Sequence, residues 1–215
     1  MILIDGKTIS NKIKLELEET IKKDNLTPGL GIILVGERED SKVYVNMKKK
    51  ACSKLGIRNI DVKLDSDVSE EDIIKEVTRM NNNNNIHGIL IQLPLPKHIN
   101  TQNVLSKVSI KKDVDGFHAL SMGNLALNTD VKYFPPCTPK GCMELLDRYK
   151  IKVEGKNVVV IGKSHIVGMP LSLMLMNKDA TVTVCHIKTK DLKEHTRKAD
   201  IIFCACGVPH LISKD

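Results

Sequence analysis

The hydrophobic positions of the chain follow two periods in turn, one typical of helices and one typical of strands. Near the N-terminus, apolar residues recur at every fourth position, at Ile9, Ile13, Leu17 and Ile21. Residues four apart share one face of a helix, so this spacing predicts an amphipathic helix. Residues 29–35 follow as a short apolar run, which is the pattern of a strand buried on both faces of a parallel sheet.

The same alternation continues to about residue 96. A helix is expected over residues 41–52, and the alternating apolar positions 60, 62 and 64 predict a strand. Ser69, two glutamates and Asp72 form a capping box, which marks the start of a helix that runs to Met80. Residues 86–93 predict a further buried strand, stopped by Pro94. Strands and helices that alternate in this way predict an α/β fold with a parallel sheet.

The second half of the chain repeats this pattern after an irregular stretch over residues 109–136. Thr138 and Pro139 are interpreted as an N-cap followed by proline at the first helical position. We therefore expect two domains, residues 1–138 and residues 139–215. In the second domain, predicted strands at 156–162, 180–185 and 199–207 enclose a helix at 169–176. This order predicts a Rossmann-like dinucleotide-binding domain with a parallel sheet.

Composition narrows the class of ligand. The 215 residues carry a net charge of +7, which suits nucleic acid, a membrane surface or an anionic small molecule. The lysines are dispersed, and aromatic residues make up only 3% with no Trp, so platforms for stacking nucleic-acid bases are scarce. We therefore favour small anionic ligands and expect no nucleic-acid partner.

Localisation and metal binding are addressed by two further features. No apolar run is long enough to span a membrane, and the N-terminus lacks the order of a signal peptide. The six cysteines lack the paired spacing of a zinc site. We interpret them as buried reduced thiols, which predicts no metal centre and a cytoplasmic location.

Tyr44 and Lys48 are the first candidates for chemistry. Their spacing of four places phenol and ammonium on one face of the predicted helix, where both can contact one ligand. A partly buried pocket lowers the pKa of a lysine, and a neighbouring phenol can orient a substrate or pass a proton. The pair predicts a proton-handling site, although such a pair is also typical of a helix surface.

The turn after the strand at 156–162 is the candidate cofactor site. Strand, glycine-containing turn and helix N-terminus present free backbone N–H groups to a pyrophosphate. Its glycine spacing departs from G-x-G-x-x-G, so an ordinary turn between strand and helix remains the alternative. Residues 185–188 contain no acid to bind an adenosine ribose, whereas Lys163 and Lys188 can meet a 2′-phosphate. The sequence therefore favours NADP, with NAD as the alternative.

Five segments in order resemble the bifunctional methylenetetrahydrofolate dehydrogenase/methenyltetrahydrofolate cyclohydrolase family: residues 41–52, 88–96, 112–116, 136–141 and 162–170. The resemblance covers essentially the whole chain. It implies two α/β domains with a cleft between them, and a homodimer formed through the cofactor domain. It also implies NADP-linked oxidation of 5,10-methylenetetrahydrofolate to 5,10-methenyltetrahydrofolate, then hydrolysis to 10-formyltetrahydrofolate. These reactions belong to one-carbon metabolism and supply purine biosynthesis.

The resemblance also implies roles for single residues. Lys48 would activate the water that opens the methenyl bridge, Tyr44 would pack against the folate, and Gln92 would hold the lysine. Asp115 would anchor the pterin through its N–H donors, and Leu93 would belong to the same substrate site. Taken alone, Gln92 could instead cap a strand, and Asp115 could form the turn before a glycine.

The cofactor set implied by the resemblance is Gly162, Lys163 and Ser164 on the phosphates and ribose, with Thr138 and Ile187. The family usually has arginine at position 163 and serine at position 187. In this chain Lys163 offers a point charge in place of the bidentate guanidinium group, and Ile187 offers no hydrogen bond.

Two other readings compete with the bifunctional enzyme. Relatives in the family continue beyond residue 215, so we expect the second domain to be truncated here. A folate- or dinucleotide-binding protein without turnover is therefore the alternative. Short-chain dehydrogenases also use Tyr-x-x-x-Lys, but their glycine-rich loop precedes that pair, whereas Gly162 follows it.

Overall fold

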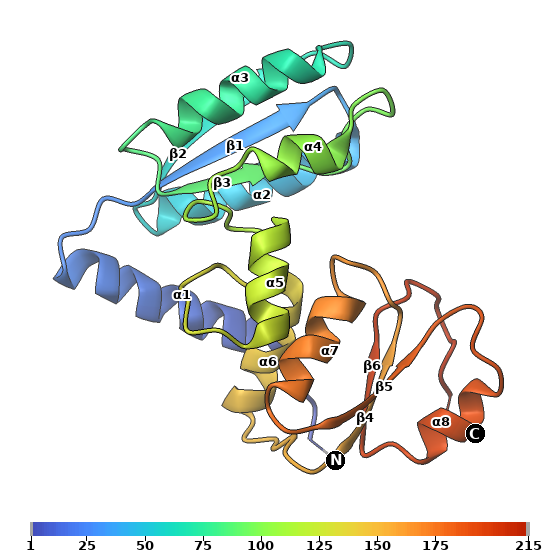
Figure 1. Cartoon of the computed structure of the whole chain (residues 1–215). Helices are drawn as coiled ribbons and strands as arrows, with labels where there is room; N and C mark the ends of the chain where they lie inside the picture. The colour runs from blue at the N-terminus through green and yellow to red at the C-terminus, as the bar shows by residue number, and fades with distance from the viewer. Residues whose placement is uncertain (1, 214–215) are drawn as a thin grey trace. The chain divides into compact units, whose positions relative to one another are not determined.

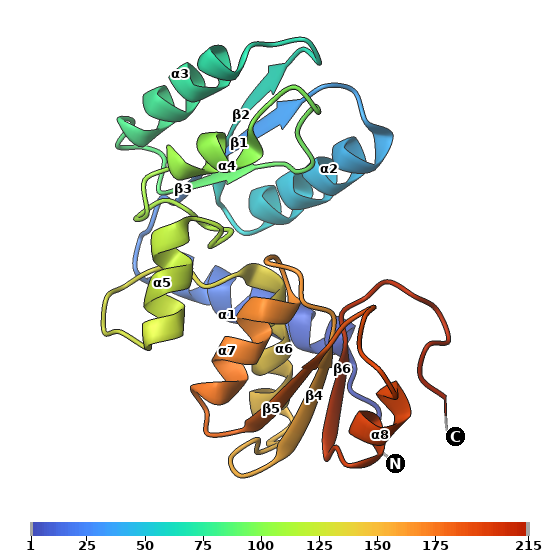
Figure 2. The same cartoon turned by 45° about the vertical axis from the view of Figure 1, so that its right-hand side comes forward.

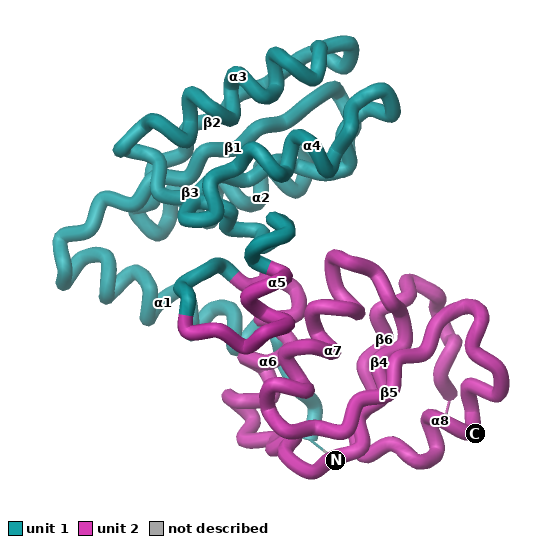
Figure 3. The backbone as a smooth tube through the Cα atoms, viewed as in Figure 1, with its two compact units in different colours: residues 1–121, 131–134 teal, residues 122–130, 135–215 magenta. Residues whose placement is uncertain are grey.

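The computed structural model describes residues 2–213. The chain divides into two compact units, residues 1–121 with 131–134 and residues 122–130 with 135–215 (Figure 3). Each unit contains its own three-stranded parallel sheet (Figure 1). The predicted α/β class with parallel sheets is confirmed. The domain boundary at residue 138 stays a prediction.

The sheet of the first unit has the order β2-β1-β3. Its strands are β1 (Gly29–Val35), β2 (Arg58–Leu64) and β3 (Gly88–Ile91). The central strand β1 is almost completely buried, which explains its continuous apolar sequence. Helix α1 (Gly6–Lys23) precedes β1, and it is followed along the chain by α2 (Glu39–Lys54), α3 (Glu70–Asn81) and α4 (Thr101–Ser106). Helix α5 (Ala119–Leu127) begins in the first unit and continues into the second.

Helices α2 and α3 cover opposite faces of this sheet (Figure 2). On one face, Ile73 and Val77 of α3 pack against Ile33 of β1 and have no exposed surface. On the other face, Val45 of α2 packs against Ile32. Because all three strands run in parallel, their carboxyl ends meet at one edge of the sheet. The segments that continue from β1 and β3 therefore begin at the same edge.

The helix start expected at Ser69 is confirmed, with Ser69 as the N-cap of α3. The N–H of Asp72 donates to the hydroxyl oxygen of Ser69 at 3.1 Å, and that hydroxyl donates to the Asp72 carboxylate at 2.7 Å. The amphipathic helix expected at the N-terminus is α1, capped by the Asp5 carboxylate. No residue of α1 is buried, however, and Leu17 on its apolar stripe is 45% exposed.

The irregular stretch expected over residues 109–136 is wrong in part, because α5 lies within it. Its N-terminal end has no evident capping sequence, so the helix gave no start signal. Tertiary contacts hold it instead. Leu125 is buried, and the side-chain amide of Asn177 donates to its carbonyl at 2.8 Å.

The sheet of the second unit has the order β5-β4-β6. Its strands are β4 (Asn157–Ile161), β5 (Thr181–Cys185) and β6 (Ile201–Cys204), and its further helices are α6 (Cys137–Arg148), α7 (Gly168–Met176) and α8 (Leu192–Arg197). Leu146 of α6 and Leu171 of α7 pack against Val158 and Val160 of β4. The predicted strand–turn–helix order around residue 162 is thereby confirmed.

Two sequence-based expectations in this unit are wrong. Helix α6 begins at Cys137, so Thr138 is not its N-cap and Pro139 is not at the first helical position. The first-turn N–H groups of a helix have no partners within it, so proline is tolerated at these positions. The cysteines are also not all buried. Cys137 in the first turn of α6 and Cys204 on the edge strand β6 are exposed.

Two features of the described residues bear on membrane and metal binding. Within residues 2–213, no helix has the length and apolar character needed to cross a bilayer. In the same range, no cluster of three or more His, Cys, Asp or Glu side chains is arranged to hold a metal ion.

Candidate functional site

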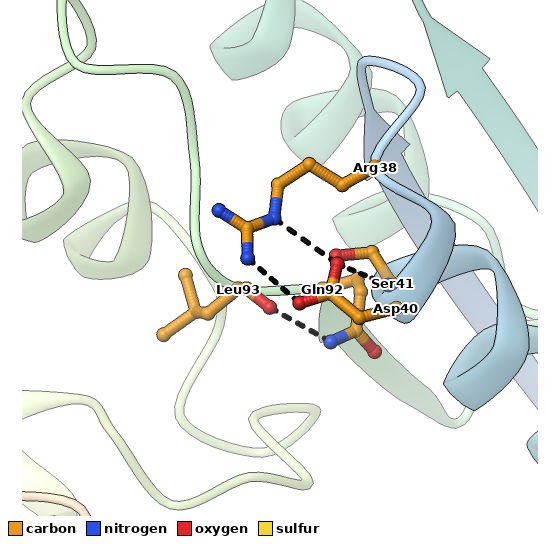
Figure 4. Close-up of polar contacts among 5 residues, drawn as sticks. All are labelled: Arg38, Asp40, Ser41, Gln92 and Leu93. Carbon is orange, nitrogen blue, oxygen red and sulfur yellow. Dashed lines mark hydrogen bonds and ion pairs between the residues drawn. The ribbon is translucent and has the colours of Figure 1, made fainter.

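Lys48 and Gln92 meet at the carboxyl edge of the first sheet. Lys48 lies on α2, and Gln92 directly follows β3. The Lys48 ammonium donates to Oε1 of Gln92 at 3.1 Å, and Nε2 of Gln92 donates to the carbonyl of Leu93 at 2.8 Å. The second bond is drawn in Figure 4. It fixes the amide of Gln92 with its oxygen toward the lysine.

The carboxyl group of Asp115 lies close enough to Lys48 for the charge of the lysine to act on it. Burial raises the pKa of Asp115 to about 6, the Lys48 charge lowers it by a smaller amount, and the Asp113 charge raises it. Asp115 therefore changes between acid and carboxylate close to neutral pH. Asp115 was a candidate in the sequence analysis, but the sequence contains no signal for this shift, which depends on burial in the folded protein and on the charge of the distant Lys48.

Asp113 is a structural carboxylate that the sequence analysis missed. It is 5% exposed, and its Oδ2 accepts hydrogen bonds from the His118 N–H at 2.9 Å and from the Ser121 hydroxyl at 3.2 Å. The same loop pairs with β3, because the N–H of Ile89 donates to the carbonyl of Lys112 at 2.6 Å. The structure thus places segments 88–92 and 112–116 side by side.

Tyr44 lies one turn before Lys48 on α2 and is 59% exposed, whereas Lys48 is partly buried. The phenol is therefore open to solvent beside the more enclosed amine. Leu93 is partly buried, and its carbonyl holds the side chain of Gln92. The peptide bond between Leu93 and Pro94 is cis.

An exposed ion pair lies at the start of α2, the helix that carries Tyr44 and Lys48. Arg38 donates to both carboxylate oxygens of Asp40, at 3.1 Å and 2.7 Å (Figure 4). This pairing lowers the pKa of Asp40 to about 2, and the Ser41 N–H also donates to its Oδ1 at 2.8 Å. The sequence analysis did not single out these residues, since charged side chains at a helix start are common.

In the second unit, two glycines allow a close backbone approach at the turn between β4 and α7. Gly162 has a φ of +122°, and a Cβ on it would lie 2.3 Å from the carbonyl oxygen of Ala205. A Cβ on Gly168 would lie 1.9 Å from the carbonyl oxygen of Gly162. Oγ of Ser164 accepts the N–H of Val167 at 3.1 Å and that of Gly168 at 3.4 Å. Ser164 therefore shapes the turn that begins α7.

A pocket of about 470 Å³ lies beside this turn. Its lining includes Gly162, Lys163, His186, Ile187 and Cys206. One lysine among mainly apolar neighbours suits a ligand with a flat ring and an anionic group. The side chain of Ile187 is 97% exposed at the pocket rim.

The other proposed cofactor residues lie outside the pocket lining. Thr138 is exposed in the first turn of α6, and Ser164 belongs to the turn itself. Of the two candidate lysines, Lys163 lines the pocket and Lys188 does not. The backbone N–H of Lys188 instead donates to Nδ1 of His186 at 3.2 Å.

Comparison with family models gives two matches that follow one another along the chain. Residues 4–115 match the model described as tetrahydrofolate dehydrogenase/cyclohydrolase, catalytic domain. Residues 136–215 match the model described as tetrahydrofolate dehydrogenase/cyclohydrolase, NAD(P)-binding domain.

Individual relatives also match this chain over nearly its whole length. The bifunctional protein FolD of Sulfurimonas denitrificans is 51% identical over 219 residues, which covers 100% of this chain and 76% of that protein. Bifunctional protein FolD 2 of Arabidopsis thaliana is 50% identical over 214 residues, covering 98% of this chain and 72% of the relative.

Two solved structures superpose on most of the chain. The bifunctional enzyme FolD, a methylenetetrahydrofolate dehydrogenase/cyclohydrolase from Campylobacter jejuni, has a TM-score of 0.95 at 45% identity and covers 99% of this chain and 76% of its own. A FolD structure from Trypanosoma brucei, complexed with NADP cofactor and inhibitor, has a TM-score of 0.91 at 37% identity, with 98% and 73% covered.

Proposed function

This chain belongs to the tetrahydrofolate dehydrogenase/cyclohydrolase family, and on that premise we propose that it catalyses both reactions. It oxidises 5,10-methylenetetrahydrofolate to 5,10-methenyltetrahydrofolate with NADP, and it hydrolyses the product to 10-formyltetrahydrofolate. The observation that carries the proposal is the match of both family models, in order, along a chain about half identical to bifunctional relatives. Binding of folate or dinucleotide without turnover is not favoured.

The second unit contains residues that fit NADP. Gly162 and Gly168 let the backbone of strand, turn and helix pack closely at this place, and backbone N–H groups at the N-terminus of a helix suit a phosphate. Lys163 lines the adjacent pocket and supplies a positive charge for a phosphate on the ribose. NADP held there would supply the acceptor for the hydride of the folate. The protein's part in that step is to bind and orient both molecules.

For the folate, we assign binding to three side chains of the first unit. The Asp115 carboxylate accepts hydrogen bonds from N–H donors of the pterin, and these bonds are strong because the acceptor is charged. The exposed ring of Tyr44 packs against the folate ring system. Leu93 contributes apolar contact beside Gln92.

For the hydrolysis, we assign the base to Lys48. Water adds to the methenyl carbon while the Lys48 amine takes one of its two protons, which leaves a hydroxyl group on that carbon. The bond from the carbon to N5 then breaks as the hydroxyl becomes the formyl C=O; its proton goes to N5, and the formyl group remains on N10. Gln92 keeps the amine at the site through the 3.1 Å hydrogen bond, which is the positioning that such a step requires.

Lys48→Met tests this assignment. The variant keeps a long apolar side chain but has no amine, so we expect cyclohydrolase activity to fall by at least about 100-fold, the scale of general-base catalysis. Methenyltetrahydrofolate should then accumulate, as followed by its absorbance beside that of NADPH. Lys50→Met, an exposed neighbour on α2, is the matched control. Hydrolysis at the wild-type rate in Lys48→Met would reject the assigned role.

We also propose that the protein acts as a homodimer in the cytoplasm, with tetrahydrofolate derivatives as its small-molecule partners and no nucleic acid. The proposal is supported by the family membership.

A further inference from the structure

Three backbone carbonyls at the C-terminal end of α3 surround the ammonium group of Lys112. The ammonium donates to the carbonyl oxygens of Asn81 at 2.7 Å, Asn83 at 2.9 Å and Met80 at 3.3 Å. Carbonyls in the last turn of a helix lack partners within it, and the helix dipole is negative there. A lysine at this place satisfies the carbonyls and is attracted by the dipole. The contact therefore fastens the loop that carries Lys112 to α3.

The side chain of Asn81 fastens the same loop a few residues earlier. Its Nδ2 donates to the carbonyl of Lys107 at 2.7 Å, and its Oδ1 accepts the N–H of Ser109 at 2.9 Å. The N–H of Lys112 also donates to the Ser109 carbonyl at 2.7 Å. The loop is thus held to the end of α3 at two places before it reaches the candidate site.

Beyond Lys112 the chain passes directly into that site. Asp113 forms a parallel bridge with Ile89 next to β3, and the Gly116 N–H donates to the Asp113 carbonyl at 3.2 Å. Asp115 lies inside this short turn. The distance between the Asp115 carboxyl group and Lys48 therefore depends on where the loop with Lys112 is attached to α3.

We infer that Lys112 is a positioning residue for the folate site, acting through Asp115. Its ammonium holds the loop against α3, and this sets the place of the Asp115 carboxyl group beside Lys48. The inference rests on the proposed function, in which Asp115 binds the pterin. The charges that shift the pKa of Asp115 are those of Lys48 and Asp113, so Lys112 acts on Asp115 through geometry.

Lys112→Met is the first test, since it keeps a side chain of similar length and removes the donors. We expect the KM for methylenetetrahydrofolate to rise about tenfold, with kcat and the KM for NADP within about twofold of wild type, because the loss is in folate binding. Lys112→Arg retains charge and donors and should recover most of the loss. Lys111→Met, at the exposed neighbouring position, should match wild type.

A double-mutant cycle with Asp115→Asn separates positioning from a general effect on stability. If Lys112 acts through Asp115, Lys112→Met should change the folate KM by less than about twofold in the Asp115→Asn background. An equal change in both backgrounds would overturn the inference. Should Lys112→Met fail to fold, Lys112→Gln, which keeps an amide donor, carries the same comparison.

The outcomes separate the inference from the function on which it rests. An active wild type with an unchanged folate KM in Lys112→Met overturns the inference and leaves the proposed function intact. A wild-type protein that turns over no folate removes both.

Discussion

The carboxyl group of Asp115 makes the stability of the protein depend on pH in a direction opposite to that of most acidic residues. Its pKa is about 6 in the folded protein, against 3.8 for an ordinary aspartate side chain. At a pH between these two pKa values, Asp115 binds more protons in the folded state than in the unfolded state. The free energy of unfolding therefore falls as pH rises from about 4 to about 6, and the contribution stays lost above that pH.

Asp115→Asn should remove this dependence. At pH 7 we expect the variant to be more stable than wild type, by at most about 3 kcal/mol, the equivalent of a shift of about two pKa units. Below about pH 3 the difference should vanish, because the wild-type carboxyl is then mostly protonated in both the folded and the unfolded state. Urea denaturation at the two pH values measures it, with the exposed Asp65→Asn as control. The same difference at both pH values would contradict the expectation.

Single residues also show what the sequence could predict at this scale. Lys48 was selected from its spacing to Tyr44, and Gln92 and Asp115 were selected through a family resemblance. The structure brings Lys48 close to the other two. The buried Asp113 was not selected. Its role depends on the backbone N–H of His118 and the hydroxyl of Ser121, which meet it only after the loop has folded.

At the scale of elements, the turn from β4 into α7 depends on the absence of a side chain at Gly168. Gly168→Ala places a Cβ against the carbonyl oxygen of Gly162, a backbone atom that cannot move away easily. We expect a loss of roughly 1–3 kcal/mol in stability, as for other overpacked sites, together with weaker NADP binding.

Gly141→Ala is the matched control, because a Cβ there meets nothing within 4 Å on the helix α6. It should raise stability by about 0.5–1 kcal/mol, since alanine is the better helix former. Thermal unfolding and NADP titration of both variants measure the contrast. A Gly168→Ala protein as stable as Gly141→Ala would show that the turn can relax.

The elements that the sequence predicts well are those with a local signal. Strand β1 has a continuous apolar run, and α3 has both a capping box and an apolar face. Helix α5 had neither and was missed, since Leu125 and its partner Asn177 are distant in sequence. The start of α6 was misplaced because proline is tolerated throughout a first helical turn.

At the scale of the whole molecule, cofactor binding should raise stability by mass action. NADP at about one hundred times its Kd adds about 2.7 kcal/mol to the free energy of unfolding if it binds only the folded protein. NAD lacks the 2′-phosphate that Lys163 can meet, so at the same concentration it should add less. Thermal shift with each dinucleotide measures the difference. Equal shifts with NADP and NAD would show that Lys163 does not select NADP over NAD. An unchanged preference for NADP in Lys163→Met would show the same.

In each sheet the strand that comes first in the sequence is the central one: β1 in one unit and β4 in the other. Each later strand therefore joins an edge of a strand that already exists. During synthesis β2 can pair with β1 once α2 has crossed over, before the ribosome has made β3, and β5 can pair with β4 in the same way. Neither sheet requires insertion between two paired strands, so each can grow outward in the order of translation.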